Sequence, residues 1–214
     1  MQKLAVIKIG GNIIDDTEKL NSFLADFAAV EGYKILVHGG GKIATAIGEK
    51  LGIRSEYING RRVTDSATLE LVTMVYGGLI NKNIVSGLQW RGCNAIGLTG
   101  ADGNMMCARK REVKEVDYGY VGDINSDGIN VNGFQRLLEA GFVPVVSPIT
   151  YDGQGNLLNT NADTIAQEIA KAMAAIMQVQ LIYCFEKKRL LADVNDDNSV
   201  TTGIDTEVYQ QLKA

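Results

Sequence analysis

The stretch Ile35-Leu36-Val37-His38-Gly39-Gly40-Gly41-Lys42 places three glycines directly after an apolar run. A helical pattern follows at once over Lys42–Leu51. A strand that ends in glycines and opens a helix exposes bare backbone N–H groups and a positive helix end to an anion. A lone glycine triplet is typical of a tight turn, but the apolar run Leu4–Ile9 leads into Gly10-Gly11 in the same way. The two copies together indicate an anion-handling site.

The composition limits the class of protein. A chain of 214 residues is long enough for one α/β domain with a substantial core. Its net charge of −4 indicates no broad basic surface, so we expect no nucleic-acid partner. No apolar stretch approaches the roughly 20 residues of a membrane span, and no signal peptide precedes Leu4. Scattered Cys93, Cys107 and Cys184 favour reduced thiols and a cytoplasmic location.

Short apolar runs alternate with helical patterns along the chain. We expect strands at Leu4–Ile9, Lys34–Val37, Asn94–Leu98, Val143–Val146 and Leu181–Phe185. We expect helices after Asp15 or Asp16, at Lys42–Leu51, from Ser66 to about Arg91, at Phe134–Ala140, at Ala162–Met177 and near Glu207–Leu212. This alternation predicts a three-layer αβα sandwich with a mainly parallel central sheet and ligands at the carboxyl ends of its strands.

Three segments interrupt the alternation. Tyr57–Val63 holds Asn-Gly between two extended pieces, which is a strong hairpin signal. Gly77-Gly78 falls inside the long helix and predicts close packing against another element there. The polar segment from Met106 to Ile124 predicts surface hairpins that cover an edge or form a lid.

The candidate chemistry therefore lies at strand ends. Lys8 is a cation in an apolar strand, the Arg61-Arg62 pair follows the hairpin turn, and Asn159-Thr160-Asn161-Ala162-Asp163 precedes a helix. One arginine could clamp a carboxylate or phosphate, or the pair could simply be solvated; the Asn-rich block could be a helix cap alone. No nucleophile–base pair supports acyl transfer, and His38, the single histidine, is typical of a structural residue. Donors and cations without a base suit phosphoryl transfer, although the Walker A pattern is absent.

These residues also resemble a family. Ile7-Lys8-Ile9-Gly10-Gly11, Val37-His38-Gly39-Gly40-Gly41, Asn59-Gly60-Arg61-Arg62-Val63-Thr64 and Asn159–Asp163 resemble, in family order, the signature blocks of the N-acetyl-L-glutamate kinases of the amino acid kinase family. The segment Tyr183–Lys188 and the long hairpins are similar to the Bacteroidetes-type branch. The resemblance implies ATP-dependent phosphorylation of the γ-carboxylate of N-acetyl-L-glutamate, or of the N-succinyl analogue, in arginine biosynthesis.

The resemblance also implies roles for individual residues. It gives Lys8 and Asp163 catalytic roles, with Lys8 neutralising the transferring phosphoryl group and Asp163 orienting lysines. It assigns acceptor binding to Gly40, Gly41, Arg62 and Asn159, and nucleotide binding to Gly10, Gly11, Glu186 and Lys187. Mg²⁺ would arrive with ATP, so we predict no dedicated metal site in the protein. The family's habit of dimerising through the long helix implies a homodimer, and the absence of an extra N-terminal helix implies insensitivity to arginine.

One kinase domain over 1–214 follows, with an acyl-glutamate lobe at about 1–148 and a nucleotide lobe at about 149–214. Family members usually continue to a Gly-Gly-Met-type segment with a second catalytic lysine, so we expect the C-terminal part to be incomplete. Arg189 stands where the family usually has glycine. Two alternatives stay open: a relative acting on another carboxylate, carbamate or nucleoside monophosphate, and a non-catalytic ligand-binding homologue.

Overall fold

A computed structural model of the chain describes residues 1–184, 190–191 and 200–201. The chain divides into two compact units, Met1–Cys184 and Phe185–Ala214. The larger unit contains all of the site residues discussed below except Glu186 and Lys187, which lie outside the described residues. The predicted lobe boundary near residue 148 stays a prediction.

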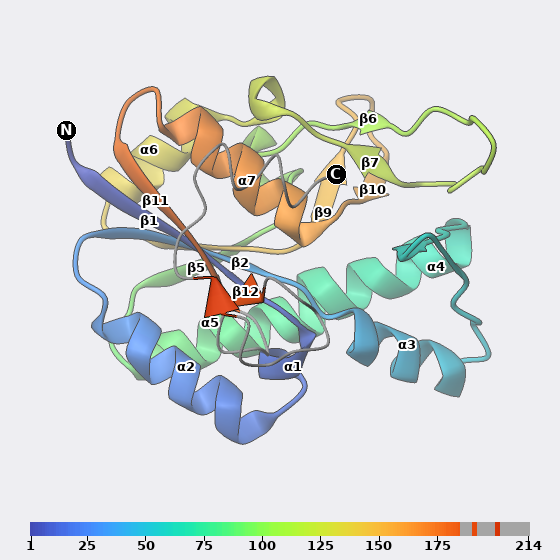
Figure 1. The fold of residues 1–214 in the computed structure, drawn as a ribbon, viewed down its shortest axis with the longest axis horizontal. Coiled ribbons are helices and arrows are strands. Elements are labelled where there is room, and N and C mark those ends of the chain that lie inside the picture. The colour runs from blue at the N-terminus through green and yellow to red at the C-terminus, as the bar shows by residue number, and fades with distance from the viewer. Residues whose placement is uncertain (185–189, 192–199, 202–214) are drawn as a thin grey trace. The chain divides into compact units, whose positions relative to one another are not determined.

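The centre of the larger unit is a parallel five-stranded sheet (Figure 1). Its strand order is β11 (Gln178–Cys184), β1 (Lys3–Ile9), β2 (Tyr33–His38), β8 (Val143–Val146) and β5 (Ala95–Leu98). All four neighbouring pairs run parallel, so the sheet is fully parallel within this unit. The five apolar runs therefore form the five predicted strands, as expected for strands that are buried on both faces.

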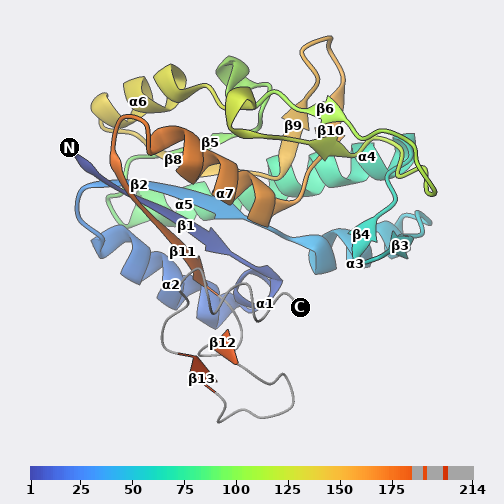
Figure 2. The ribbon, with the colours of Figure 1, turned by 45° about the horizontal axis from the view of Figure 1, so that its top comes forward.

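Helices cover both faces of this sheet, which confirms the three-layer prediction (Figures 1 and 2). One face carries α1 (Gly11–Ile14), α2 (Thr17–Ala29), α3 (Gly41–Lys50), α4 (Ser66–Val72) and α5 (Asn81–Trp90). The other face carries α6 (Val131–Glu139) and α7 (Ala162–Met173). Side chains of Asp16, Asp65, Asn130 and Asn161 accept backbone N–H groups of the first turns of α2, α4, α6 and α7. The last helix ends at Met173, four residues before the predicted end.

Alternate side chains of the strands belong to two separate cores. Leu4 and Val6 of β1 pack with α6 and α7, where Phe134 and Ile169 are fully buried. Ile7 and Ile9 pack on the opposite face, in the core that contains α2, α4 and α5. Because side chains of a strand alternate, Lys8 shares the face of Leu4 and Val6 and points toward α7. This alternation places Lys8, the buried cation of β1, beside α7.

The long helix predicted over Ser66–Arg91 extends as expected but is not α-helical throughout. Its middle eight residues, Thr73–Ile80, form the π-helical segment η1. The predicted close packing holds for Gly77, where an added Cβ would lie 3.3 Å from Thr99 Cγ2, but not for Gly78, where it would meet nothing within 4 Å. The wider turns of η1 lie beside the triple glycine, and π-helical turns are frequent at functional sites.

Three small hairpins lie beyond the carboxyl ends of the strands (Figures 1 and 2). They are β3–β4 (Tyr57–Ile58 and Arg61–Arg62), β6–β7 (Arg109–Lys110 and Gly122–Asp123) and β9–β10 (Ile149–Tyr151 and Leu157–Asn159). The first was predicted by Asn-Gly, and the second forms the expected polar hairpin. Short 3-10 turns η2 (Asp102–Asn104) and η3 (Ser126–Gly128) complete this region.

In the smaller unit, β12 (Leu190–Leu191) and β13 (Val200–Thr201) pair antiparallel. The predicted polar loop 193–199 and the predicted helix near Glu207–Leu212 lie outside the described residues, as does Arg189. None of the helices in the described part of the chain has the length and hydrophobicity that crossing a bilayer requires.

Candidate active site

A cavity of about 270 Å³ opens where β1 and β2 end, between the triple glycine and the β3–β4 and β9–β10 hairpins. Eight predicted site residues line it: Lys8, Gly10, Gly11, Gly40, Gly41, Arg62, Asn159 and Asp163. They come from four separate sequence blocks. The remaining two predicted residues, Glu186 and Lys187, lie outside the described part of the chain.

Lys8 and Asp163 form an ion pair at the floor of this cavity. Lys8 Nζ lies 2.7 Å from Asp163 Oδ1. The lysine side chain is 10% exposed, whereas the aspartate side chain is 49% exposed. Lys8 Nζ also lies near Gly10, because an added Cβ at that glycine would be 3.7 Å from it. A nearly buried ammonium group beside bare backbone can therefore meet an anion with little competition from water.

Within the triple glycine, the backbone geometry requires glycine most strictly at Gly40. Gly40 has φ +144°, and a Cβ there would lie 2.2 Å from Cδ1 of Ile80. Gly40 is also the N-cap of α3. The sequence predicted that a ligand approaches these glycines closely. In the structure, the side chain of Ile80 from the long helix occupies the space on one side of Gly40.

Arg62 is held in the cavity wall by the protein. Its Nη2 donates to Gly41 O at 2.9 Å and to Thr45 Oγ1 at 3.0 Å, and its Nη1 donates to Ser55 Oγ. The guanidinium carbon also lies 4.7 Å from the centre of the Tyr57 ring. Only 6% of the residue is exposed, which excludes an ordinary solvated arginine. Arg61 lines the same cavity but is exposed.

Asn159 enters the cavity from β10 on the opposite side. Its Nδ2 donates to Thr64 Oγ1 at 3.0 Å, and its backbone N–H donates to Tyr120 O at 2.9 Å. The Asn-rich block caps a helix and also lines the cavity. Asn161 Oδ1 accepts from the backbone N–H of Thr164 as a helix cap, while Asn159 and Asp163 line the cavity.

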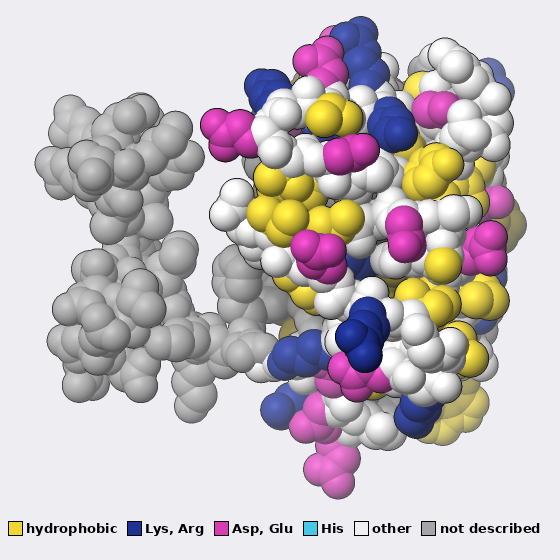
Figure 3. Space-filling model, turned by 90° about the vertical axis from the view of Figure 1, so that its right-hand side faces the viewer, with side chains coloured by type: hydrophobic (Ala, Val, Ile, Leu, Met, Phe, Trp, Pro, Cys, Tyr) yellow, Lys and Arg dark blue, Asp and Glu magenta, His cyan; other side chains and the backbone are white. Residues whose placement is uncertain are grey.

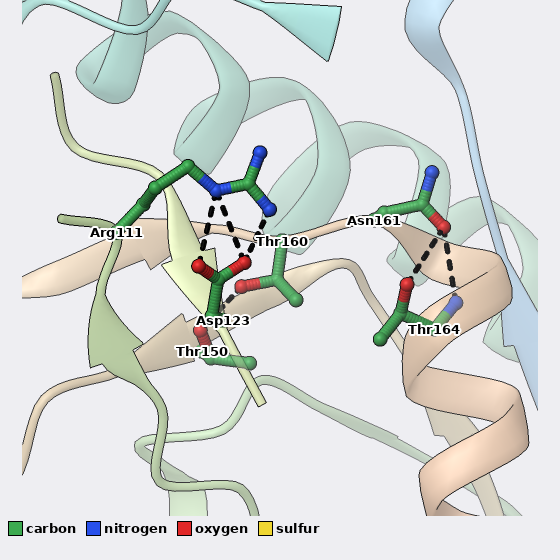
Figure 4. Close-up of polar contacts among 6 residues, drawn as sticks. All are labelled: Arg111, Asp123, Thr150, Thr160, Asn161 and Thr164. Atoms are coloured by element: carbon green, nitrogen blue, oxygen red, sulfur yellow. Dashed lines mark hydrogen bonds and ion pairs between the residues drawn. The ribbon is translucent and has the colours of Figure 1, made fainter. Parts of the chain in front are cut away.

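Figure 4 shows further polar contacts in the neighbourhood of the Asn-rich block, two of which no sequence pattern indicated. Thr150 and Thr160 share a hydrogen bond of 2.7 Å between their hydroxyl oxygens. Arg111 pairs with Asp123 across the β6–β7 hairpin, and this hydrogen bond raises the pKa of the Arg111 guanidinium. Tyr183 Oη donates to Asp163 O at 3.2 Å.

Apolar and aromatic residues of the cavity wall were also not predicted from the sequence. Tyr57, Tyr76, Val121 and Pro148 line the cavity. Burial raises the pKa of the Tyr76 hydroxyl, and the nearby Arg62 charge opposes that rise. These residues come from the β3–β4 hairpin, η1, the segment before β7 and the segment after β8, so only the folded chain brings them together.

His38 is a structural residue, as its sequence context predicted. It is fully buried, its Nδ1 donates to Gly39 O at 2.8 Å, and its Nε2 accepts from Asn81 Nδ2 at 3.1 Å. Burial lowers its pKa from 6.5 to about 4. The imidazole is therefore neutral, with both ring nitrogens engaged, and does not line the cavity.

The charges of the cavity differ from those of the nearby surface. On the face that carries the ends of α3 and α4 and the β6–β7 loop, acidic and basic side chains are interspersed (Figure 3). The cavity instead gathers three cations, Lys8, Arg61 and Arg62, with one carboxylate, Asp163. A positive, glycine-lined cavity at the carboxyl ends of parallel strands is suited to a substrate with several negative charges.

This fold and site define a small-molecule kinase class. The chain belongs to the amino acid kinase family, whose model matches residues 3–199. It is 56% identical over 213 residues to the acetylglutamate kinase of Phocaeicola vulgatus and 58% identical over 213 residues to that of Bacteroides fragilis. Both matches cover 100% of this chain; they cover 82% and 81% of those relatives. A solved structure from Streptococcus mutans has a TM-score of 0.74 at 29% identity, covering 88% of this chain and 74% of the other.

Proposed function

We propose that this protein phosphorylates the γ-carboxylate of N-acetyl-L-glutamate with ATP, forming an acyl phosphate, a step of arginine biosynthesis. The high identity to acetylglutamate kinases over the whole of this chain supports the reaction. The observation that carries the proposal is that one cavity brings together Lys8, Arg62, Asn159 and the glycines of both strand ends. Those four blocks are the ones whose resemblance implied this reaction.

The charge of the cavity fits the charge of the reactants. An N-acylglutamate carries two carboxylates, and phosphoryl transfer spreads further negative charge over the equatorial oxygens. Lys8, 10% exposed and 2.7 Å from Asp163, has a fixed position from which it neutralises that charge. Asp163 orients Lys8, so we assign these two residues the catalytic roles.

The acceptor occupies the side of the cavity formed by the hairpins. Arg62 pairs with the α-carboxylate of the acceptor, because a buried and preoriented guanidinium is suited to bind a carboxylate with charge-assisted hydrogen bonds. Gly40 and Gly41 hold the acyl amino acid through backbone N–H groups, and Asn159 binds its amide. N-succinyl-L-glutamate would bind in the same cavity, and the acceptor panel therefore includes it.

ATP approaches from the β1 end of the cavity, where Gly10 and Gly11 present backbone to its phosphates. Glu186 and Lys187 complete the nucleotide site in this proposal. Mg²⁺ arrives bound to ATP, because its preferred octahedral shell is filled largely by phosphate oxygens and water. We place the reaction in the cytoplasm, where reduced thiols such as Cys93 are stable.

We also propose a homodimer formed along the long helix. Met74, Leu79 and Trp90 expose 57%, 46% and 81% of their surface along this helix. An added Cβ at Gly78 would meet nothing within 4 Å, so the helix surface is open to a second helix at that point. Light scattering of the purified protein tests this proposal: a monomer or hexamer mass contradicts it.

The experiment is an acceptor panel. The protein is incubated with ATP, Mg²⁺ and one acceptor at a time, and any acyl phosphate is trapped with hydroxylamine. Hydroxamate formed with N-acetyl- or N-succinyl-L-glutamate supports the proposal, and the ratio of the two identifies the acyl group. Hydroxamate or ADP formed only with aspartate, carbamate or a nucleoside monophosphate refutes it, and binding of N-acylglutamate without turnover refutes the catalytic part.

A further inference from the structure

Thr64 is a buried polar residue that has no assigned role in the proposed reaction. It is fully buried, and it lies between two residues of the acceptor side of the cavity. Its Oγ1 donates to the backbone carbonyl of Arg62 at 3.1 Å and accepts from Asn159 Nδ2 at 3.0 Å. Thr64 itself does not line the cavity, so any effect on a ligand must pass through its two partners.

The direction of these two hydrogen bonds fixes the Asn159 amide. A hydroxyl has one proton, and the Arg62 carbonyl can only accept it, so Thr64 Oγ1 can offer only lone pairs to Asn159. The NH₂ end of Asn159 must therefore point toward Thr64. The amide oxygen of Asn159 has no hydrogen bond within the described part of the chain and remains available to a ligand N–H.

The backbone of a third segment holds both partners in register. Tyr118–Val121 forms isolated parallel bridges on both sides, with Thr64 through Gly119 and with Asn159 through Val121. Thr64 N–H donates to Tyr118 O at 2.9 Å, Tyr120 N–H donates to Thr64 O at 2.7 Å, and Asn159 N–H donates to Tyr120 O at 2.9 Å. Gly119 makes this fit possible: it has φ +70°, and an added Cβ would lie 2.2 Å from Thr64 O.

We propose that Thr64, held by Tyr118–Val121, is a positioning residue that sets the Asn159 amide to accept a hydrogen bond from the N–H of the acceptor's acylamino group. This assignment rests on the proposed kinase function and names the feature of the acceptor that the site reads. An acylated amine keeps one N–H donor and carries no charge, so it matches an amide oxygen that is fixed in place.

The test compares Thr64→Val with Thr64→Ser, alone and combined with Asn159→Ala. Thr64→Val removes the acceptor for Asn159 Nδ2 at nearly constant volume, and we expect the acceptor KM to rise by about five- to tenfold. The ATP KM should stay within about twofold, and Thr64→Ser should restore the acceptor KM. In the Asn159→Ala background, Thr64→Val should change the acceptor KM by less than about twofold, because its partner is already gone.

A purely structural role predicts the opposite pattern. Thr64→Val would then lower kcat and raise both KM values, or would act equally in the parent and Asn159→Ala backgrounds; either result overturns the proposal. A parent protein that phosphorylates no N-acylglutamate overturns the proposed function instead, so the two failures are distinguishable.

Gly119→Ala provides a second variant in case Thr64→Val does not fold. Its Cβ displaces Thr64 O, and we expect the same rise in acceptor KM with little change in ATP KM. Gly141→Ala is the matched control, because Gly141 has φ +80° but an added Cβ there meets nothing within 4 Å. Equal acceptor KM values for the two alanine variants would contradict the proposal.

Discussion

Replacing Lys8 by methionine tests the centre of the proposed mechanism. Methionine retains an unbranched side chain of similar length, so the strand packing of β1 is disturbed little. What disappears is the positive charge 2.7 Å from Asp163 and close to Gly10. The change therefore separates the charge of Lys8 from its volume.

The expected loss is large for turnover and small for stability. Removing one preorganised group at developing charge typically costs about 3–4 kcal/mol, which is a fall in kcat of about 100- to 1,000-fold. The ion pair itself contributes little to folding, because half of the Asp163 side chain is exposed and solvent screens its charge. We expect the Tm to change by no more than about 5 °C.

The assay is hydroxylamine trapping under saturating ATP and acceptor, with thermal unfolding of the same samples. Lys171→Met is the matched control: Lys171 lies on α7 like Asp163, and its Nζ is 2.8 Å from Glu168 Oε1. That variant loses an ion pair of similar length away from the cavity and should retain parent activity. A kcat for Lys8→Met within threefold of the parent, in folded protein, would refute the assigned role.

Three further changes test other parts of the site and fold. Arg62→Lys should raise the acceptor KM by about 10- to 100-fold and leave the ATP KM unchanged, since lysine lacks the planar fork; an unchanged acceptor KM would indicate Arg61 instead. Gly40→Ala should lower the Tm and turnover, because its Cβ would lie 2.2 Å from Ile80 Cδ1; a parent-like variant contradicts this. Because burial lowers the His38 pKa from 6.5 to about 4, only the unfolded chain binds this proton between those values. Urea titrations should therefore show the free energy of unfolding falling by about 3 kcal/mol more, from pH 6.5 to 4, than in His38→Gln; equal pH slopes refute it.

The sheet could be predicted because its central strands β1, β2 and β8 are largely buried. Such strands appear in the sequence as short continuous apolar runs, and all five runs became neighbours in one parallel sheet. Their carboxyl ends share an edge, so the residues that follow them could be expected to meet. Lys8, Gly10 and Gly40 were found by this reasoning alone.

The π-helical segment could not be predicted from spacing. Thr73–Ile80 contains apolar residues that are equally compatible with an α-helix, and local propensity does not distinguish the two. Its register is decided by packing against distant elements: Ile80 fills the space that Gly40 leaves by lacking a Cβ, and Gly77 faces Thr99. The aromatic wall residue Tyr76 enters the cavity from this segment, and so it was missed for the same reason.

The two sides of the cavity are built in different ways, and this difference should separate their functions. Lys8 lies in β1 of the central sheet and Gly10 directly follows that strand, which is fixed by both cores. Arg62 and Asn159 sit on small hairpins and are joined through Thr64, which lies 95 residues before Asn159 in the sequence. Changes in the hairpins can therefore reshape the acceptor side without moving the phosphoryl side. It follows that substitutions on the sheet should act mainly on kcat, whereas substitutions in the hairpins should act mainly on the acceptor KM.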